Sequence, residues 1–210
     1  MRAARSACTS GVQRAEWSRG VSPLPRIRIE APPWAADLVD WNRAYTSDEE
    51  RMDLVIALAR ENVLREGGGP FGAAVFEADS GRPVSVGVNL VVALNNSVLH
   101  AETVAIMLAQ QRLGSYTLRA PGMPAHELVA SCDPCAMCLG ATLWSGVTRL
   151  VCGAARDDAA AIGFDEGPVF PASYDYLEER GIAITRGVRR AEARAVLELY
   201  LDRGGVVYNP

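Results

Sequence analysis

The chain has 210 residues, of which 49% are hydrophobic and 22% are charged, a composition typical of one globular domain. Its charge is uneven: residues 1–30 carry six arginines and two acids, whereas residues 31–210 carry 15 arginines and 23 acids. An acidic body is a poor surface for phosphate backbones, and no apolar run reaches the about 18 residues that a membrane-spanning helix needs. We therefore expect a small-molecule substrate, and neither nucleic acid nor a membrane as partner.

Residues 1–33 are rich in Arg, Ser, Pro and Gly and show no sustained apolar period. This composition predicts a mobile, Arg-rich extension. A second interpretation stays open, because an Arg-rich and nearly acid-free segment is also typical of a transit peptide. A secretory signal peptide is not expected, since the segment has no continuous apolar stretch.

Regular structure is expected over residues 34–203, followed by a tail over 204–210. Ser47 or Asp48 can cap the first helix, and the Gly-Gly-Gly-Pro run at 67–70 ends it. Helices that alternate with short apolar strands predict an α/β layered domain, and an opening hairpin makes its sheet mixed. The expected elements are a helix near 48–65, strands over 72–77 and 83–92 joined by a turn at 79–81, a helix over 100–113, a strand over 127–131, a helix over 135–145, a strand over 149–153, a loop with a short turn around 163–168, a helix over 173–180, a strand over 182–185 and a helix over 190–202.

Five cysteines are present, and three of them lie between residues 132 and 138. An odd number with this clustering does not fit a disulfide framework. It indicates a metal site in a reducing compartment, so we expect a cytoplasmic protein.

Two short segments offer the metal ligands, one from His100 to Glu102 and one from Pro134 to Cys138. Cys135 and Cys138 are three residues apart, so one helical face presents both sulfurs, and the helix start after Pro134 favours thiolates. One imidazole and two thiolates make three protein ligands, whereas zinc normally takes four. The sequence therefore predicts a catalytic Zn²⁺ held by His100, Cys135 and Cys138, with the fourth position open to water.

Glu102 lies two residues after His100, a spacing that turns its carboxylate away from the metal ligand on a helix. It can therefore serve water at the metal instead of binding the ion. A carboxylate in this place can take a proton from zinc-activated water and deliver protons to a ring nitrogen and a leaving amine. This chemistry replaces an amino group on an aromatic ring by oxygen.

Cys132 leaves two other kinds of site open. With Cys135 and Cys138 it could hold part of an iron–sulfur cluster, or it could complete a closed, structural zinc site. The sequence offers no evident fourth cysteine for a cluster, and Cys132 is expected to end a strand as a small apolar side chain. His126, the only other histidine, is expected in a loop or at a strand edge.

The His-x-Glu and Pro-Cys-x-x-Cys pair resembles the cytidine deaminase-like superfamily, for which it is the known signature. Most of residues 45–210 take part in the resemblance, which is nearest to bacterial guanine deaminases. It implies a three-layer α/β/α fold with a mixed five-stranded sheet, and a homodimer whose exchanged C-terminal tails close the partner's active site. The segments that carry it are 69–73, 88–89, 131–135, 140–141 with Trp144, and 163–166.

The resemblance also implies roles for residues outside the motifs. A guanine edge offers N–H donors, so Glu166 matches a second carboxylate that accepts from this edge and shares in proton transfer. Asp133 departs from the pattern, which usually has Glu before the Pro-Cys pair, but it is not a metal ligand. The implied substrate contacts are a hydrogen bond from Asn89, a pocket lining by Phe71 and Trp144, packing of Phe164 on the base, a backbone contact near Ala101, and closure by Tyr208.

The expected reaction is hydrolysis of guanine to xanthine and ammonia. A variant of this hypothesis is a relaxed enzyme that also accepts aminotriazines such as ammeline, or one that acts on guanosine or other nucleosides. A tRNA adenosine deaminase shares both motifs, although the acidic body and the Gly-Phe-Asp-Glu loop at 163–166 disfavour it. A non-catalytic zinc module is the alternative from another class, and it gives no use to Glu102.

Overall fold

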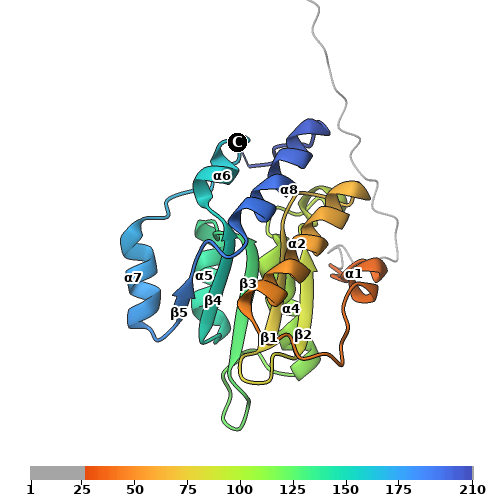
Figure 1. Ribbon diagram of the computed structural model, residues 1–210. Helices are drawn as coiled ribbons and strands as arrows, with labels where there is room; N and C mark the ends of the chain where they lie inside the picture. Colours follow the sequence, from red (N-terminus) through yellow and green to blue (C-terminus); the bar gives the residue numbers. More distant parts are fainter. Residues whose placement is uncertain (1–26, 210) are drawn as a thin grey trace, which may run out of the picture.

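The computed structural model describes residues 27–209, and a five-stranded sheet lies at the centre of this part of the chain (Figure 1). The strand order is β2-β1-β3-β4-β5. β1 runs antiparallel to both β2 and β3, whereas β3, β4 and β5 are parallel, so the sheet is mixed as predicted. The strands are β1 (Gly72–Glu77), β2 (Pro83–Val88), β3 (His126–Cys132), β4 (Arg149–Ala154) and β5 (Ala183–Thr185).

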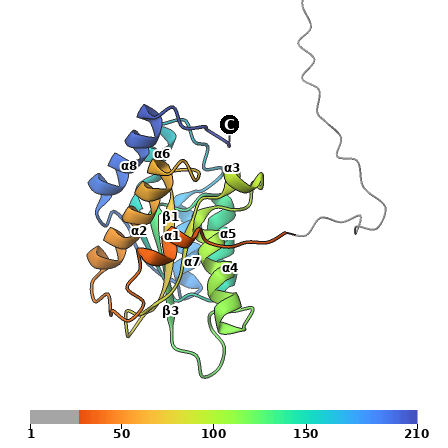
Figure 2. The ribbon, with the colours of Figure 1, turned by 90° about the vertical axis from the view of Figure 1, so that its right-hand side faces the viewer.

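Helices cover both faces of the sheet and complete the three layers of the predicted α/β fold. Figure 2 shows α2 and α8 on one side of the sheet and α4 and α5 on the other. α7 lies beside β5 at one edge of the molecule (Figure 1). The helices within the described residues are α1 (Pro33–Asp37), α2 (Asp48–Leu64), α3 (Val91–Leu94), α4 (Ala101–Leu113), α5 (Ala136–Ser145), α6 (Arg156–Ala160), α7 (Pro171–Glu179) and α8 (Arg190–Asp202).

The central strand β1 shows how the sheet supplies both layers of the core. Ala74 and Phe76 belong to the apolar cluster under α2, whereas Ala73 and Val75 belong to the cluster under α4. Successive side chains of a strand point to opposite faces, so a strand buried on both faces is apolar throughout. This explains why the short apolar runs of the sequence become interior strands.

The helix ends follow their local sequence. Ser47 Oγ accepts a hydrogen bond from the Glu50 N–H at 3.2 Å, and three acids stand in the first turn of α2, where the helix dipole favours negative charge. α4 ends at Gly114, whose φ of 63° lies in the left-handed region that glycine adopts without strain. Both positions agree with the predicted boundaries.

The structure corrects the sequence-based elements at short segments. β2 ends at Val88 and not at residue 92, because Asn89 Oδ1 accepts the Val91 N–H at 3.2 Å and the chain turns into α3. α1 and α6 contain five residues each, which is too short for the helical period to show in the sequence. The apolar run at 88–92 therefore predicted a strand where a turn and a helix form.

Most of the predicted extension, residues 1–26, lies outside the described residues. Its described part contacts the body of the protein, since Ile29 and Ala31 pack against the apolar cluster under α2. None of the described helices is long and apolar enough to cross a membrane.

Four charged side chains form a network at the end of the sheet where β3 and β4 begin. Arg149 bonds to Asp48 at 2.5 Å and to Glu127 at 3.1 Å, and Arg51 bonds to Glu127 at 2.5 Å. The Glu127 side chain is fully buried, so its charge depends on these two guanidinium groups. The network attaches the first turn of α2 to the sheet.

Candidate active site

Segments from four parts of the chain meet at the opposite end of the sheet. Asn89 follows β2, Cys135 follows β3 and Arg156 follows β4, while Phe71 stands directly before β1. Because β1 is antiparallel to its neighbours, its beginning lies at the edge where β2 and β3 end. The topology thus gathers residues that are far apart in the sequence.

The structure brings the three predicted metal ligands together. His100 is the N-cap of α4, Cys135 is the N-cap of α5, and Cys138 lies in the first turn of α5. Their ligand atoms all lie within 4.8 Å of one another, and Cys135 Sγ is 3.5 Å from His100 Nδ1. The starts of α4 and α5 therefore bring these three side chains together.

This arrangement fits a zinc ion. Zn–S and Zn–N bonds of about 2.3 and 2.0 Å at a tetrahedral angle separate sulfur and nitrogen by about 3.5 Å, as found between Cys135 and His100. The hydrogen bond from Cys138 lowers the pKa of the Cys135 thiol to about 4, so a thiolate is available. Within residues 27–209, no other group of histidines, cysteines and acids can hold a metal.

Two buried carboxylates stand beside the metal ligands. The Glu102 and Glu166 side chains line the same small pocket as His100 and Cys135, and each residue is only 8% exposed. Burial raises the pKa of both, and the nearby charge of Cys135 adds to the effect; the pKa of Glu166 reaches about 8. Acids with raised pKa values can take and return protons near neutral pH.

Aromatic side chains cover the pocket. The Phe164 ring packs against Phe71 at 5.2 Å and against Tyr208 at 5.0 Å between centroids, and the Tyr208 ring lies 6.2 Å from that of His100. The enclosed space is about 10 Å³, roughly what a single water molecule needs. A base can enter only when part of this cover moves.

The C-terminal tail forms the outer side of the cover. Asn209 exchanges two hydrogen bonds with Asp165: its Nδ2 donates to the Asp165 carbonyl at 2.6 Å, and its carbonyl accepts the Asp165 N–H at 3.2 Å. The Tyr208 hydroxyl lies against Gly69, where an added Cβ would come within 2.4 Å of the hydroxyl oxygen. The tail thus closes over the site of its own chain.

Asn89 is fully buried behind the pocket wall, where its N–H donates to the Phe71 carbonyl at 3.1 Å, and Asn62 supports it. The Asn62 Nδ2 group donates to the Asn89 and Gly69 carbonyls, both at 2.9 Å. Asn89 Nδ2 has no hydrogen-bond partner within the described residues, so it remains free to donate to a ligand. Ala101 is fully buried as the first residue of α4. In the sequence Asn62 looks like an ordinary polar residue of a helix, so its support of the Asn89 and Gly69 carbonyls was not predicted.

Three other residues considered in the sequence lie away from the pocket or play no part in it. Trp144 is 80% exposed on α5, so the structure does not bring its side chain to the pocket. Cys132 ends β3 as expected, and its Sγ is 3.8 Å from the Ala155 carbonyl rather than in the ligand group. His126 begins β3 and is fully buried, with Nδ1 2.9 Å from the Leu118 carbonyl.

Asp133 has a structural role that the sequence did not reveal. Its carboxylate is buried, forms a two-pronged ion pair with Arg186 and accepts the Arg156 N–H at 3.2 Å. These bonds attach the segment before Cys135 to the first residue of α6 and to the loop that follows β5. The aspartate that departs from the family pattern is therefore fully paired.

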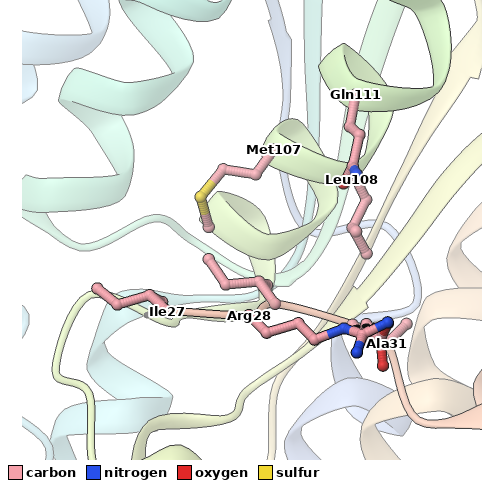
Figure 3. Close-up of a pocket in the computed structure, with 8 residues that line it drawn as sticks. Ile27, Arg28, Ala31, Met107, Leu108 and Gln111 are labelled. Carbon is pink, nitrogen blue, oxygen red and sulfur yellow. Dashed lines mark hydrogen bonds and ion pairs between the residues drawn. The ribbon is translucent and has the colours of Figure 1, made fainter. Parts of the chain in front are cut away.

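A larger opening, about 570 Å³ in volume, lies elsewhere, between residues 27–31 and α4. Met107 and Leu108 of α4 face the N-terminal segment across it (Figure 3). Its lining has no cluster of histidines, cysteines or acids, so the chemistry belongs to the smaller pocket.

Residues 45–154 match the family of the cytidine and deoxycytidylate deaminase zinc-binding region. The chain belongs to this family. It is a zinc-dependent hydrolytic deaminase, and His100, Cys135 and Cys138 form the group that could hold the metal ion. The deaminase motifs fall on the starts of α4 and α5, where the metal geometry is found.

Curated relatives include deaminases of two substrate classes. The guanine deaminase of Bacillus subtilis is 37% identical to this deaminase over 127 residues, which are 60% of this chain and 77% of the relative. The tRNA-specific adenosine deaminase of Haemophilus influenzae is 28% identical over 156 residues, 74% of this chain and 84% of the relative.

Solved structures confirm the fold class and the resemblance to guanine deaminases. The guanine deaminase from Nitrosomonas europaea is 45% identical with a TM-score of 0.80, and the match covers 84% of this chain and 97% of that one. The protein NE0047 in complex with 2,6-diaminopurine is 47% identical with a TM-score of 0.81, covering 87% and 96%.

Proposed function

We propose that this deaminase converts guanine and water to xanthine and ammonia. The observation that carries the proposal is the second buried carboxylate, Glu166, which faces the same closed pocket as Glu102. Guanine presents N–H donors along the edge next to its amino-bearing carbon, and a carboxylate accepts such bonds. The likeness to guanine deaminases supports the same substrate.

Each polar group of the pocket then has a task. Zinc, when bound, supplies the positive charge that makes water acidic enough to be a nucleophile at neutral pH. Glu102 takes a proton from the attacking water and passes it to the ring nitrogen, then takes the second proton of that water and delivers it to the leaving amine. Glu166 accepts from the guanine edge and shares in this proton transfer, while the free Asn89 Nδ2 donates to an acceptor of the purine.

The remaining contacts hold the base flat against the metal ligands. Phe71 lines the pocket, Phe164 packs behind Phe71 and Tyr208, and the backbone at Ala101 borders the ring. The assignment of Trp144 to the lining has no support within one chain, because this side chain is exposed.

The tail supports a free base as substrate rather than a nucleoside or an RNA. Tyr208 and Asn209 are themselves part of the pocket wall, on the side away from the sheet. A ribose attached to the base, or an RNA strand beyond it, would need this wall to be absent during the reaction. The acidic body also disfavours an RNA backbone.

A panel of guanine, guanosine, adenine, cytosine, cytidine and ammeline tests the proposal, with ammonia release as the measurement. We expect guanine to be turned over best, and ammeline to be the second substrate if the pocket is relaxed. Turnover of a structured tRNA without turnover of guanine would overturn the proposal in favour of a tRNA adenosine deaminase. Bound zinc without turnover of any compound would leave a structural zinc module.

We further propose that two chains form a homodimer and exchange their tails. Gly204 and Gly205 are the first residues of the tail, and glycines allow a hinge there, while the exposed Trp144 offers apolar surface for a partner. An exchanged tail would make the contacts that Tyr208 and Asn209 make in one chain.

Complementation distinguishes exchange from closure within one chain. A protein truncated after Gly205 lacks the tail, and a Glu102→Ala protein lacks the proton carrier, so each alone should be inactive. If tails are exchanged, mixed dimers contain one site with both parts and regain activity. No recovery in mixtures whose subunits are shown to exchange would contradict the proposal.

We also propose a cytoplasmic location. The four cysteines within the described residues are free thiols, as a reducing compartment allows. Fractionation of the producing cells, followed by immunoblotting, checks this location.

A further inference from the structure

The loop that carries Glu166 has no regular structure of its own. It runs from Gly163 to Val169 between α6 and α7, and Gly163 and Gly167 both have positive φ, at 101° and 69°. A carboxylate on such a loop has a defined position only if the loop is attached to something rigid. The attachments of this loop therefore decide where Glu166 lies.

One attachment comes from the metal side. The Ala136 N–H donates to the Glu166 carbonyl at 2.9 Å, and Ala136 is the first residue of α5, next to Cys135. Before Glu166, Asp165 bonds to Asn209 of the tail through its N–H and its carbonyl, at 3.2 and 2.6 Å. The part of the loop that follows Glu166 needs a second attachment to the body of the domain to set the carboxylate direction.

Arg156 supplies that second attachment. Its two terminal nitrogens donate to the Val169 carbonyl at 2.6 Å and to the Gly167 carbonyl at 2.7 Å. Its own N–H donates to Asp133, two residues before Cys135. Arg156 stands at the start of α6, directly after the interior strand β4, so it is itself well anchored.

We propose that Arg156 is a positioning residue for Glu166, and that it thereby sets the specificity of the site for guanine. This inference rests on the proposed function, because it gives Glu166 the task of binding the guanine edge. Only a planar guanidinium presents two N–H groups in a fixed fork that can span two carbonyls. A lysine at 156 could serve one carbonyl at a time.

The test compares Arg156→Gln with Arg190→Gln in the zinc-loaded full chain. Arg190 also anchors α6, through Asp158 at 2.8 Å, but within residues 27–209 it makes no hydrogen bond to the Glu166 loop. We expect Arg156→Gln to lower kcat/KM for guanine by about 100-fold with zinc retained, since a displacement of about 1 Å is enough for such a loss. Arg156→Lys should recover part of the rate, and Arg190→Gln should stay near the wild-type value.

A double variant separates positioning from general loss of structure. If Arg156 acts through Glu166, then Arg156→Gln should have little further effect once Glu166 is replaced by Gln. Losses that multiply in the double variant, or a wild-type rate in Arg156→Gln, would overturn the inference.

Amide hydrogen exchange provides a measurement that needs no substrate. Exchange of the amides at 164–169 should be about tenfold faster in Arg156→Gln and unchanged in Arg190→Gln. Unchanged exchange in Arg156→Gln would overturn the positioning role. Absence of guanine turnover by the wild-type protein would contradict the proposed function instead, and the exchange rates would still decide whether Arg156 holds the loop.

Discussion

The metal half and the recognition half of the site are built in different ways. The metal half consists of His100, Cys135 and Cys138, which lie on the first turns of two helices packed on one face of the sheet. The proposed recognition half consists of side chains from three separate loops and the tail, among them Asn89 and Glu166. Regular structure holds the first half, and polar side chains that bond to backbone carbonyls hold the second.

Because the two halves are held by different contacts, the choice of substrate can change without loss of the zinc chemistry. Asn62 holds the carbonyls of Gly69 and Asn89, and Arg156 holds those of Gly167 and Val169. None of these bonds involves a metal ligand. Altering them should move the recognition half alone, and the expected results below test that separation.

The largest effect is expected when the chemistry itself is removed. Glu102→Ala should lower kcat by about 10⁴-fold, because the main proton carrier is removed, while about one zinc per chain remains. Cys138→Ala should lose both zinc and activity. Metal analysis together with ammonia release checks both, and retained activity in Glu102→Ala would refute its role.

The next effect separates the two halves. Glu166→Gln should lower kcat/KM for guanine by about 100-fold, because an amide accepts the N–H bonds of the guanine edge less well than a carboxylate. Zinc content should not change. Asp157→Asn, on the exposed side of α6, is the matched control and should behave as wild type. An unaffected Glu166→Gln variant would mean that this residue only shapes a turn.

A smaller effect is expected from Asn62→Ala. It leaves two buried carbonyls without their donor, so the free energy of unfolding should fall by about 2 kcal/mol and Tm by about 4–8 °C. KM for guanine should rise as Asn89 shifts, with zinc retained. Denaturant unfolding and steady-state kinetics measure both, and Arg60→Ala on the exposed side of α2 is the control. Equal behaviour of the two variants would show that Asn62 supports nothing.

The smallest effect is expected on the stability of the fold, with both halves of the site unchanged. The hydrogen bond from Arg149 holds the pKa of Asp48 below its usual value, so this pair stabilises the fold above about pH 4 and is lost as the pH falls through the lowered pKa. The free energy of unfolding of the Asp48→Asn protein should therefore be about 1 kcal/mol lower than that of the wild-type protein at pH 7. This difference should narrow towards pH 3.

Urea unfolding at several pH values measures this difference in the free energy of unfolding. Turnover of guanine at pH 7 should be the same in the wild-type and Asp48→Asn proteins, because Asp48 lies at the far end of the sheet from the site. A changed kcat/KM in Asp48→Asn would show that the two ends of the sheet are coupled.

The sequence predicted the metal half and most of the fold. β1 and α8 have the predicted bounds, and the ligand group forms as the spacing of Cys135 and Cys138 indicated. These features depend on local periodicity and on residues within one helical turn of each other. Glu166 and Tyr208 came from the family resemblance, because an acid in a turn and a tyrosine in a tail have no local signal of their own.

The remaining features depend on contacts between distant segments. Asn62 looks like an ordinary polar residue of a helix, and Arg156 like one of a loop, until the fold places carbonyls beside them. The family resemblance placed Trp144 in the pocket lining, but the structure turns it outward from α5. β2 was predicted too long because Asn89 turns the chain with a side-chain bond that no periodicity reveals.

The position of the tail also bears on how the protein should be produced. Asn209 bonds to Asp165, the neighbour of Glu166, so a purification tag joined to the C-terminus would begin beside the pocket wall. Such a tag could pull Tyr208 away from Gly69 and make an intact enzyme look weak. A tag at the N-terminus, removed before assay, keeps this end of the chain free.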